Sequence, residues 1–409
     1  MPPIAMVEPA NLIPYYVRAL CGALIREQQD LTLYTSEYQH SKLPLEDYED
    51  RLYFRYGISR FLPTASAAKR IAKGLEYPLG HWQLLNAFRK SSADILHLQW
   101  ARLPRLDCTL MDGVKHSGRK FVYTLHDVEP LYDNHGSAVH HRRLILSADA
   151  LIVHSEWARQ QLLRQFPELD KSRVAVIEHP PLIQPTQNLN RLDCRQRLNM
   201  SADEFNMLFF GSLKAFKGLD FFTNWINQVC GLPEFSRVTF TIAGSPSAPN
   251  IEQMIRSRLQ DNSRVKLRPE YIPEDEEEVY FKACDIVALP YERISQSGVL
   301  STAFAYLKPV LATGVGNFAE QTDNGRRGIS VPADPQQWTE ALGLVVWSES
   351  KQKEMQSNIA DYIDTELNWP TAARRTIAVY ERLRDADAQR TSQTQAIGRT
   401  EAIRHPVPY

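Results

Sequence analysis

Short, continuously apolar segments alternate with helical segments along almost the whole chain. One apolar run, Ile286–Leu289, is followed by a turn and by a helix that begins near Ser297 and Gly298. A second apolar run, Val310–Thr313, comes directly after that helix. Strands that are apolar at every position are buried on both faces, and two such strands joined through a helix run parallel. The pattern therefore predicts a parallel sheet with helices on both sides.

The same alternation divides the chain into two sets of strands. The first set is predicted at 31–35, 94–98, 120–125, 150–154 and 174–177, and the second at 207–210, 239–243, 265–267, 286–289, 310–313 and 329–331. Strands separated by helices in this way are typical of doubly wound α/β domains. Because 409 residues are too many for one compact core, two such domains are expected.

A polar segment lies between the two sets of strands. It contains Pro185 and lacks apolar periodicity, as is typical of a linker. A helix is predicted after Pro370, and the residues beyond it are rich in Gln, Thr and Arg, a composition that favours disorder. The predicted segments are a first domain at 1–185, a second domain at 192–370, a helix at 371–385 and a disordered tail at 386–409.

The composition excludes several classes of protein. A net charge of −1 gives no overall attraction to nucleic acid or membrane, so such binding would depend on a local patch. The five cysteines are scattered, and neither they nor the histidines show the spacing of a metal site, which fits a reducing compartment. Residues 1–12 do not resemble a signal peptide, and no run of about 18 apolar residues occurs. We therefore expect a cytoplasmic protein.

Two features of the second domain suit a phosphate group. Lys214 and Lys217 follow a predicted strand in a turn flanked by Gly211 and Gly218, and lysines on such a loop supply point charges. The predicted helix start at Ser297-Gly298 offers free backbone N–H groups and a positive dipole end. Both features follow strands of one parallel sheet, so they are expected to converge on one crevice. The alternative is a solvated basic turn without a ligand.

These residues resemble the GT-B-fold glycosyltransferases of the large retaining family 4, the group 1 glycosyl transferases of polysaccharide assembly. The family's Gly-x-Leu-x-x-x-Lys-Gly turn is matched by Gly211, Lys217 and Gly218. Further segments similar to the family's landmarks are 94–97, His126-Asp127, 150–155, Leu289-Pro290-Tyr291, 296–299, Pro309-Val310, Glu320 and the helix that ends at Tyr380-Glu381. The resemblance covers about residues 15–384 and is most specific in the second domain.

The resemblance implies a GT-B fold, with two facing doubly wound Rossmann-like domains and a C-terminal helix that crosses back onto the first. The first domain would bind the acceptor and the second a nucleotide-sugar donor, with no other cofactor and no metal. The implied function is transfer of a sugar to a hydroxyl of a lipid-linked or oligosaccharide acceptor, with retention of configuration. The implied donor-binding residues are Gly211, Ser212, Lys214, Lys217, Glu292, Gln296, Ser297, Gly298, Val299 and Thr302.

The sequence departs from the family pattern at three positions. The usual Arg after the first Gly is Ser212, so Lys214 is expected to share the phosphate role. The family's two glutamates, which contact the donor sugar and the ribose, fall at Ile294 and Thr302 here. Glu292 lies close to the first position but out of register. Backbone and hydroxyl groups of residues 296–299 are expected to serve instead.

His126 is the main catalytic candidate besides Lys217. It ends a predicted strand, where an imidazole facing a cleft could orient a hydroxyl near neutral pH, and the family places a His near the reacting carbon. The alternative is a histidine whose ring is satisfied by loop carbonyls. His97, His154 and His179 occupy similar strand ends and are interpreted as structural.

Residues 51–90 combine basic and aromatic side chains with one opposing acid, Glu76. Such a patch can lie on an anionic bilayer, where a lipid-linked acceptor would be found. The alternative is an ordinary solvated helix pair. A nucleic-acid interface is less favoured, because the rest of the chain adds no basic field.

Three other functions also fit parts of the sequence. The segment 314–319 fits the dinucleotide pattern Gly-x-Gly-x-x-Ala, but Gly325 limits the following helix to about two turns, which argues against a dehydrogenase. The missing glutamates leave open a non-catalytic nucleotide-sugar-binding subunit. A sugar-nucleotide epimerase of the same fold is the third possibility.

Overall fold

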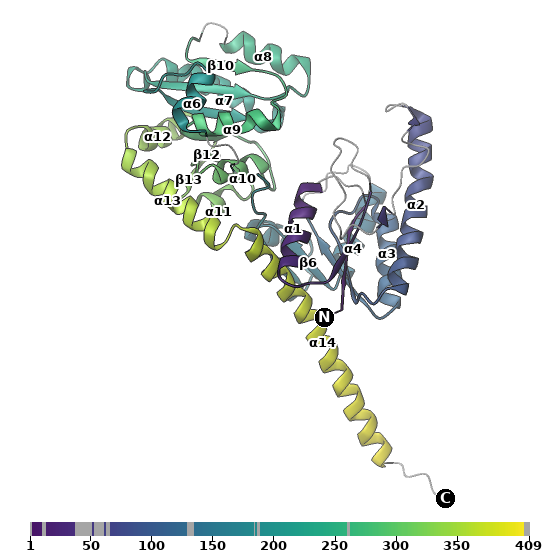
Figure 1. The fold of residues 1–409 in the computed structure, drawn as a ribbon. Coiled ribbons are helices and arrows are strands. Elements are labelled where there is room, and N and C mark those ends of the chain that lie inside the picture. The colour runs from purple at the N-terminus through teal and green to yellow at the C-terminus, as the bar shows by residue number, and fades with distance from the viewer. Residues whose placement is uncertain are drawn as a thin grey trace, which may run out of the picture. The chain divides into compact units, whose positions relative to one another are not determined.

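The computed structural model describes residues 2–9, 14–36, 51–52, 61–62, 66–128, 135–183, 185, 189–259 and 262–404 (Figure 1). The chain divides into two compact units. Unit 1 comprises Met1–His154, Arg159–Ile177 and Trp369–Tyr409, and unit 2 comprises Ser155–Ala158 and Glu178–Asn368. Each unit has its own sheet and hydrophobic core.

Unit 1 is built on a seven-stranded parallel sheet with the order β3-β2-β1-β4-β5-β6-β7. Its strands are β1 (Ile4–Glu8), β2 (Leu31–Thr35), β3 (Arg51–Leu52), β4 (Ile95–Leu98), β5 (Lys120–Thr124), β6 (Ala150–Val153) and β7 (Val174–Val176). The sequence did not predict β1, which is buried at every position and pairs with both β2 and β4. The doubly wound parallel fold expected for this half is confirmed.

The helices of unit 1 are α1 (Pro14–Arg26), α2 (Ala67–Lys90), α3 (Pro104–His116), α4 (His135–Ser147), α5 (Glu156–Gln165) and α14 (Trp369–Arg404), with a 3-10 turn at Lys171–Arg173. Helix α5 begins with residues that group with unit 2. The predicted helix pair over 51–90 lies partly outside the described residues. Within them, α2 is one helix of 24 residues.

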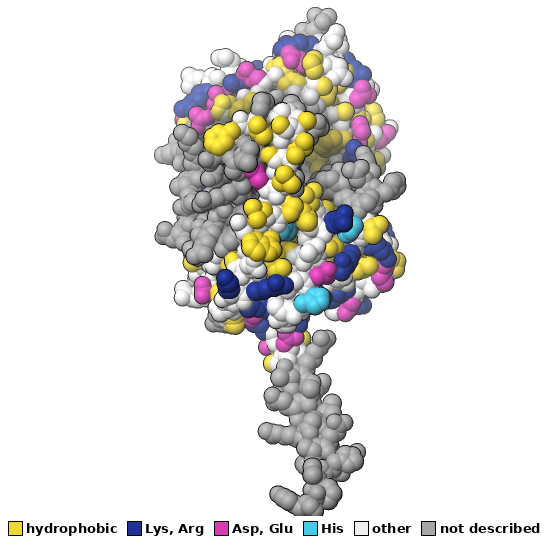
Figure 2. All heavy atoms as spheres, turned by 90° about the vertical axis from the view of Figure 1, so that its right-hand side faces the viewer, with side chains coloured by type: hydrophobic (Ala, Val, Ile, Leu, Met, Phe, Trp, Pro, Cys, Tyr) yellow, Lys and Arg dark blue, Asp and Glu magenta, His cyan; other side chains and the backbone are white. Residues whose placement is uncertain are grey.

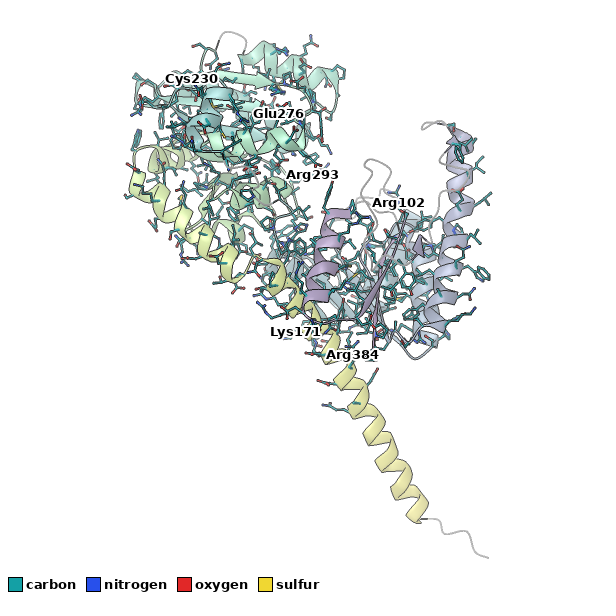
Figure 3. All side chains as sticks on the ribbon, viewed as in Figure 1. Arg102, Lys171, Cys230, Glu276, Arg293 and Arg384 are labelled. Atoms are coloured by element: carbon teal, nitrogen blue, oxygen red, sulfur yellow. The ribbon has the colours of Figure 1, made fainter. Side chains whose placement is uncertain are left out.

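The last helix, α14, packs on α1 and on the sheet of unit 1 through the buried side chains of Ala373 and Tyr380. Arg384, labelled in Figure 3, forms an ion pair with Asp94 at 2.7 Å. The sequence predicted a helix over 371–385 and a disordered tail after it. The helix instead continues to Arg404, because this segment is rich in good helix formers and contains no proline.

Unit 2 is built on a six-stranded parallel sheet with the order β10-β9-β8-β11-β12-β13. Its strands are β8 (Phe205–Phe210), β9 (Val238–Ala243), β10 (Val265–Arg268), β11 (Ile286–Leu289), β12 (Val310–Thr313) and β13 (Gly328–Val331). Each begins or ends within a few residues of a predicted strand. Continuous apolar runs identified them because this sheet is covered on both faces.

The helices of unit 2 are α6 (Arg191–Arg197), α7 (Leu219–Cys230), α8 (Pro249–Leu259), α9 (Glu274–Ala283), α10 (Gly298–Ala305), α11 (Phe318–Thr322), α12 (Pro335–Val346) and α13 (Glu349–Thr365). Two 3-10 turns, η3 (Ala215–Lys217) and η4 (Pro233–Phe235), complete the unit. Trp225 and Trp338 are fully buried, with ring centroids 5.3 Å apart, in the core on one face of the sheet. No helix among the described residues is long and apolar enough to span a bilayer.

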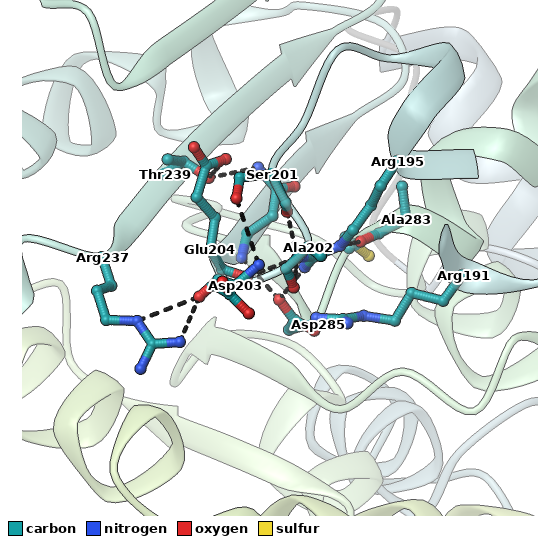
Figure 4. A network of polar contacts seen from close by, with 12 residues as sticks. Arg191, Arg195, Ser201, Ala202, Asp203, Glu204, Arg237, Thr239, Ala283 and Asp285 are labelled. Carbon is teal, nitrogen blue, oxygen red and sulfur yellow. Dashed lines mark hydrogen bonds and ion pairs between the residues drawn. The ribbon is translucent and has the colours of Figure 1, made fainter. Parts of the chain in front are cut away.

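A polar network closes the amino-terminal edge of the unit 2 sheet (Figure 4). The Arg195 side chain, 1% exposed, bonds to Asp285 at 2.6 Å and to the carbonyl oxygens of Ala283, Ser201, Ala202 and Glu204. A guanidinium is costly to bury unless its donors find acceptors, and here they do. The network fixes α6 to the sheet and leaves the opposite, carboxyl-terminal edge for ligands.

Candidate functional site

The carboxyl-terminal edge of the unit 2 sheet is shaped by glycines. Gly211 follows β8 with φ +92°, and Gly244 follows β9 with φ +145°. A Cβ atom on Gly244 would lie 1.8 Å from the carbonyl oxygen of Gly211. Only glycine allows the two backbones to approach so closely.

A third glycine holds the lysine turn against the loop after β11. Gly218 ends η3 with φ +71°, and a Cβ atom there would lie 1.7 Å from the carbonyl oxygen of Pro290. The backbone N–H of Glu292 donates to the carbonyl of Phe216 at 2.9 Å. The lysine turn and the β11–α10 loop are therefore fixed to each other.

Lys217 lies at the centre of this arrangement. Its Nζ is 5.3 Å from the centroid of the Tyr291 ring, and a Cβ atom on Gly211 would come within 3.4 Å of it. Burial, followed by repulsion from Lys214, lowers the pKa of Lys217 to about 8. A half-buried ammonium without a carboxylate partner among the described residues favours the binding of an anion.

The start of α10 faces the same point. Ser297 is its N-cap residue, and its hydroxyl accepts the N–H of Leu300 at 3.3 Å. A Cβ atom on Gly211 would lie 3.4 Å from Cγ2 of Val299, as close as it would lie to Lys217. Gly298 is exposed, and nothing lies within 4 Å of the place of its missing Cβ. The first N–H groups of α10 thus add to the charge of Lys217.

The structure brings together only part of the predicted donor set: Gly211, Lys217, Ser297, Gly298 and Val299. Lys214 is exposed, although it is near enough to Lys217 to lower the pKa of that residue. The other four side chains make no hydrogen bond or ion pair within the described part of the chain: Ser212, Glu292, Gln296 and Thr302. Their proposed roles depend on a bound ligand.

Two buried polar residues at this edge received no role from the sequence. The Tyr291 hydroxyl and the Asn317 Oδ1 make no hydrogen bond of acceptable geometry with described residues. Burial raises the pKa of Tyr291, so its hydroxyl keeps its proton. Gly316 lies next to Asn317, and a Cβ atom on it would be 2.0 Å from the carbonyl oxygen of Ile294. The only sequence signal was the position of both residues just after apolar strands.

The dinucleotide alternative for residues 314–319 fits the structure poorly. The helix after β12 is α11, which has five residues, and β13 begins six residues after its end. Glu320 on α11 instead accepts the backbone N–H groups of Glu156 and Trp157 at 3.0 and 2.9 Å, and so caps the start of α5. The segment therefore stabilises the fold.

The carboxyl-terminal edge of the unit 1 sheet carries aromatic and imidazole rings. His126, which follows β5, contacts His154, with Nδ1 and Nε2 3.0 Å apart, and its ring stacks on Trp100 at 5.4 Å between centroids. His97 lies deeper, between Thr124 and Tyr380, and burial lowers its pKa to about 3. The described residues contain no group of three His, Cys, Asp or Glu side chains suited to a metal ion.

Comparison with known proteins agrees with these features. The family "Glycosyl transferases group 1" matches residues 204–346, and the family "Glycosyltransferase Family 4" matches residues 13–180. The first match spans every strand of the unit 2 sheet, and the second spans every strand of the unit 1 sheet except β1. The chain belongs to the group 1, family 4 glycosyltransferases. The family predicted from the sequence is thereby confirmed.

Curated family members share limited identity with this chain. A D-inositol 3-phosphate glycosyltransferase from a Nocardioides species is 27% identical over 59% of this chain and 55% of its own length. A GDP-mannose:glycolipid 4-beta-D-mannosyltransferase from Xanthomonas campestris pv. campestris is 22% identical over 54% of this chain and 62% of its own length. The alignments span a little over half the length of these relatives.

Several solved structures share the fold of this chain. Sucrose-phosphate synthase from Thermosynechococcus elongatus has a TM-score of 0.70 at 18% identity, covering 94% of this chain and all of the other. The Anabaena protein HepE, solved in complex with UDP-glucose, has a TM-score of 0.64 at 15% identity, with 94% and 100% covered. The predicted GT-B fold class is confirmed.

Proposed function

We propose that this family member transfers a sugar from a nucleotide-sugar donor to a hydroxyl group. The observation that carries the proposal is the meeting of Lys217, the start of α10 and the side-chain-free backbone of Gly211 at one strand edge. Backbone N–H groups and a half-buried ammonium together suit the diphosphate of such a donor. The UDP-glucose bound by the fold relative HepE supports this class of ligand.

These groups act where negative charge develops. As the bond between the sugar's anomeric carbon and the diphosphate breaks, charge accumulates on the departing phosphate oxygen, and fixed donors near it lower the barrier. Lys217 and the N–H groups of α10 supply that stabilisation, with Lys214 adding charge from the rim. We propose on this ground that transfer does not depend on a divalent metal.

We further propose that the anomeric configuration is retained. The family's two glutamate positions are Ile294 and Thr302 here, so neither offers a carboxylate. The departing phosphate oxygen can itself take the acceptor's proton. The acceptor oxygen then bonds to the anomeric carbon on the face that the diphosphate leaves. The proton, the new bond and the broken bond balance without a further reactant.

The proposed acceptor is lipid-linked, and α2 is the proposed contact with the bilayer. The glycolipid acceptor named for the Xanthomonas relative supports a lipid-linked acceptor. The bilayer contact is supported by four apolar side chains of α2 that recur at helical spacing and are 52–71% exposed: Ile71, Leu75, Leu79 and Trp82. Figure 2 shows hydrophobic side chains gathered on this face of the molecule, with basic side chains below them.

The opposite face of α2 is fixed to unit 1. Leu84 and Phe88 are fully buried, and His81 Nε2 bonds to the buried carboxylate of Asp107 on α3 at 2.9 Å. The helix carries five basic residues against Glu76: Lys69, Arg70, Lys73, Arg89 and Lys90. An exposed apolar stripe with an excess of positive charge suits an anionic lipid surface better than another protein.

Vesicle sedimentation tests the membrane contact. The chain should bind phosphatidylcholine vesicles only when they contain phosphatidylglycerol, and the double variant Leu75→Ser, Leu79→Ser should lose this binding. Leu344→Ser on α12, a change at a leucine that is 63% exposed, should leave binding intact. Binding that survives in the double variant would remove α2 from the contact.

A donor assay tests the function itself. UDP-, GDP- and ADP-sugars are supplied with and without glycolipid extracts, and release of nucleoside diphosphate is followed. Transfer predicts slow release without acceptor and faster release with it. Tight donor binding without release would favour the non-catalytic subunit, and a rearranged sugar without acceptor would favour the epimerase.

A further inference from the structure

Three strands of unit 1 end in groups that form one hydrogen-bonded chain. His126 follows β5, His154 follows β6 and Ile177 follows β7. The His154 Nδ1 lies 2.9 Å from the carbonyl oxygen of Ile177, and its Nε2 lies 3.0 Å from His126 Nδ1. Since the three strands are neighbours in one parallel sheet, the pairing register sets this alignment.

The Ile177 carbonyl, at one end of this hydrogen-bonded series, sets the direction of both hydrogen bonds. A carbonyl oxygen can only accept, so Nδ1 of His154 must carry a proton. In a neutral imidazole the other nitrogen then has a lone pair, and His154 Nε2 accepts. Its partner, Nδ1 of His126, must donate. His126 is thereby held with its proton on Nδ1, and its Nε2 is an acceptor.

Uncharged aromatic rings lie against both imidazoles. His154 is 4% exposed, and its ring and that of His126 both contact Tyr16, with the His126 centroid 4.9 Å away at 89°. Burial raises the pKa of Tyr16, so this neighbour stays uncharged. Trp100 stacks on the ring of His126. The rings of Tyr16 and Trp100 carry no charge that would stabilise a second proton on His126.

We propose that His154 is a positioning residue that, with the Ile177 carbonyl, fixes the tautomer and orientation of His126. Nε2 of His126 then accepts a hydrogen bond from a sugar hydroxyl. The sugar ligand in this inference rests on the proposed function. The tautomer of His126 does not depend on that function. The proposal gives His154 a positioning role in place of the structural role expected from the sequence, because its ring contacts His126 directly.

Nitrogen NMR of the full chain, labelled with 15N only at its 11 histidines, tests the tautomer without any substrate. The His126 signals are assigned from their loss in His126→Ala. We expect the proton on Nδ1 in the unaltered protein and in His154→Gln, whose amide oxygen can still accept. His154→Leu should shift His126 toward the Nε2–H tautomer, and His116→Gln, on the exposed end of α3, should change nothing.

A proton on Nε2 of His126 in the unaltered protein would overturn the proposal. So would a tautomer that His154→Leu leaves unchanged. With an active donor in hand, His154→Leu should lower turnover roughly tenfold or more, as loss of an orienting partner does, and His154→Gln should restore most of it. If no donor is turned over, the proposed function fails while the NMR result still decides the tautomer.

Discussion

The two units share one fold but differ in the residues that directly follow their strands. In unit 2, β8, β9 and η3 end in Gly211, Gly244 and Gly218, all with positive φ. In unit 1, the strands β4, β5 and β6 lead into rings, among them Trp100, His126 and His154. The carboxyl-terminal edge of the unit 2 sheet thus presents main chain and the Lys217 ammonium. The same edge of the unit 1 sheet presents aromatic and imidazole side chains.

The difference suits the two edges to different chemical groups, a diphosphate in unit 2 and a sugar hydroxyl in unit 1. A diphosphate is common to UDP-, GDP- and ADP-sugars, so backbone N–H groups and one ammonium can recognise it without side-chain variety. A sugar hydroxyl needs a directed acceptor, and a ring held by its neighbours supplies one. The predictions that follow test this contrast, beginning with the largest expected effect.

Replacing Gly218 by alanine should be the most damaging change. Gly218 and Gly118 have nearly the same φ, +71° and +72°, but a Cβ atom meets the Pro290 carbonyl at 1.7 Å in the first case and nothing within 4 Å in the second. Gly118→Ala in unit 1 should therefore cost only about 1 kcal/mol, for its left-handed backbone.

Gly218→Ala should cost more than about 3 kcal/mol, because backbone must move. Urea unfolding followed by circular dichroism measures both variants. Equal losses of stability would show that the lysine turn is not clamped to the loop after β11.

Loss of the Lys217 ammonium should lower turnover strongly. Lys217→Ala should reduce kcat by roughly a hundredfold, because in the proposed mechanism the ammonium faces charge that develops on the leaving group. The exposed Lys214 should matter less, and Lys214→Ala is the matched control. Steady-state release of nucleoside diphosphate measures both, and an unchanged rate in Lys217→Ala would remove this residue from the site.

Nucleoside diphosphate binding should weaken in alkali. The pKa of Lys217 is lowered to about 8, so the free site loses its charge as pH rises through 8. Affinity should fall roughly 25-fold between pH 7.5 and 9.5, since only the charged form attracts the anion. Lys217→Arg stays charged throughout this range and should show a flatter profile in calorimetric titrations.

One carboxyl group in unit 2 and one imidazole in unit 1 should contribute to stability with opposite pH dependence. Burial, with Glu274 nearby, raises the pKa of Glu277 in unit 2 to about 7 from an ordinary 4.5. The unfolded chain loses this proton first, so stability falls as pH rises from about 4.5 to 7. His97 in unit 1 behaves in reverse. Its pKa is lowered from 6.5 to about 3, so stability falls as pH drops through that window.

Glu277→Gln should therefore raise the thermal midpoint at pH 8 and leave it nearly unchanged at pH 4. The same substitution at Glu340, exposed on α12, is the control and should have little effect at either pH. A variant that is no more stable than the unaltered chain at pH 8 would contradict the burial of this carboxyl group.

The smallest expected effect is a gain of stability at Leu307. This residue follows α10 with φ +55° and is 39% exposed, so its side chain gains little from burial while its backbone is strained. Leu307→Gly should stabilise the chain by roughly 1 kcal/mol or less. Leu307→Ala keeps the strain and should show no gain in thermal unfolding.

Much of the fold follows from the sequence, because strands buried on both faces are predominantly apolar. The strand β1 was missed because its four apolar residues are followed directly by Glu8, and its place in the sheet depends on pairing with β2 and β4. The extent of α14 was underestimated because polar composition alone does not separate an exposed helix from a disordered segment.

The candidate site was predictable where it depends on local sequence. Gly211, Lys217 and Ser297 each follow a strand of one sheet, so their convergence could be inferred. The hydrogen bond between His126 and His154 could not, since it depends on how β5 and β6 align. The burial of Tyr291 likewise depends on the packing of α10 and α11 around it.

The central claim is that the glycine and lysine edge of unit 2 binds the diphosphate, while the ring-lined edge of unit 1 does not. Isothermal titration of UDP and GDP into three forms of the chain tests it most directly. Lys217→Ala should weaken the better nucleotide at least about tenfold, as loss of a charge-assisted contact does, and His126→Ala should leave its affinity unchanged. The account would be contradicted if Lys217→Ala bound the nucleotide as tightly as the unaltered chain, or if only His126→Ala lost affinity.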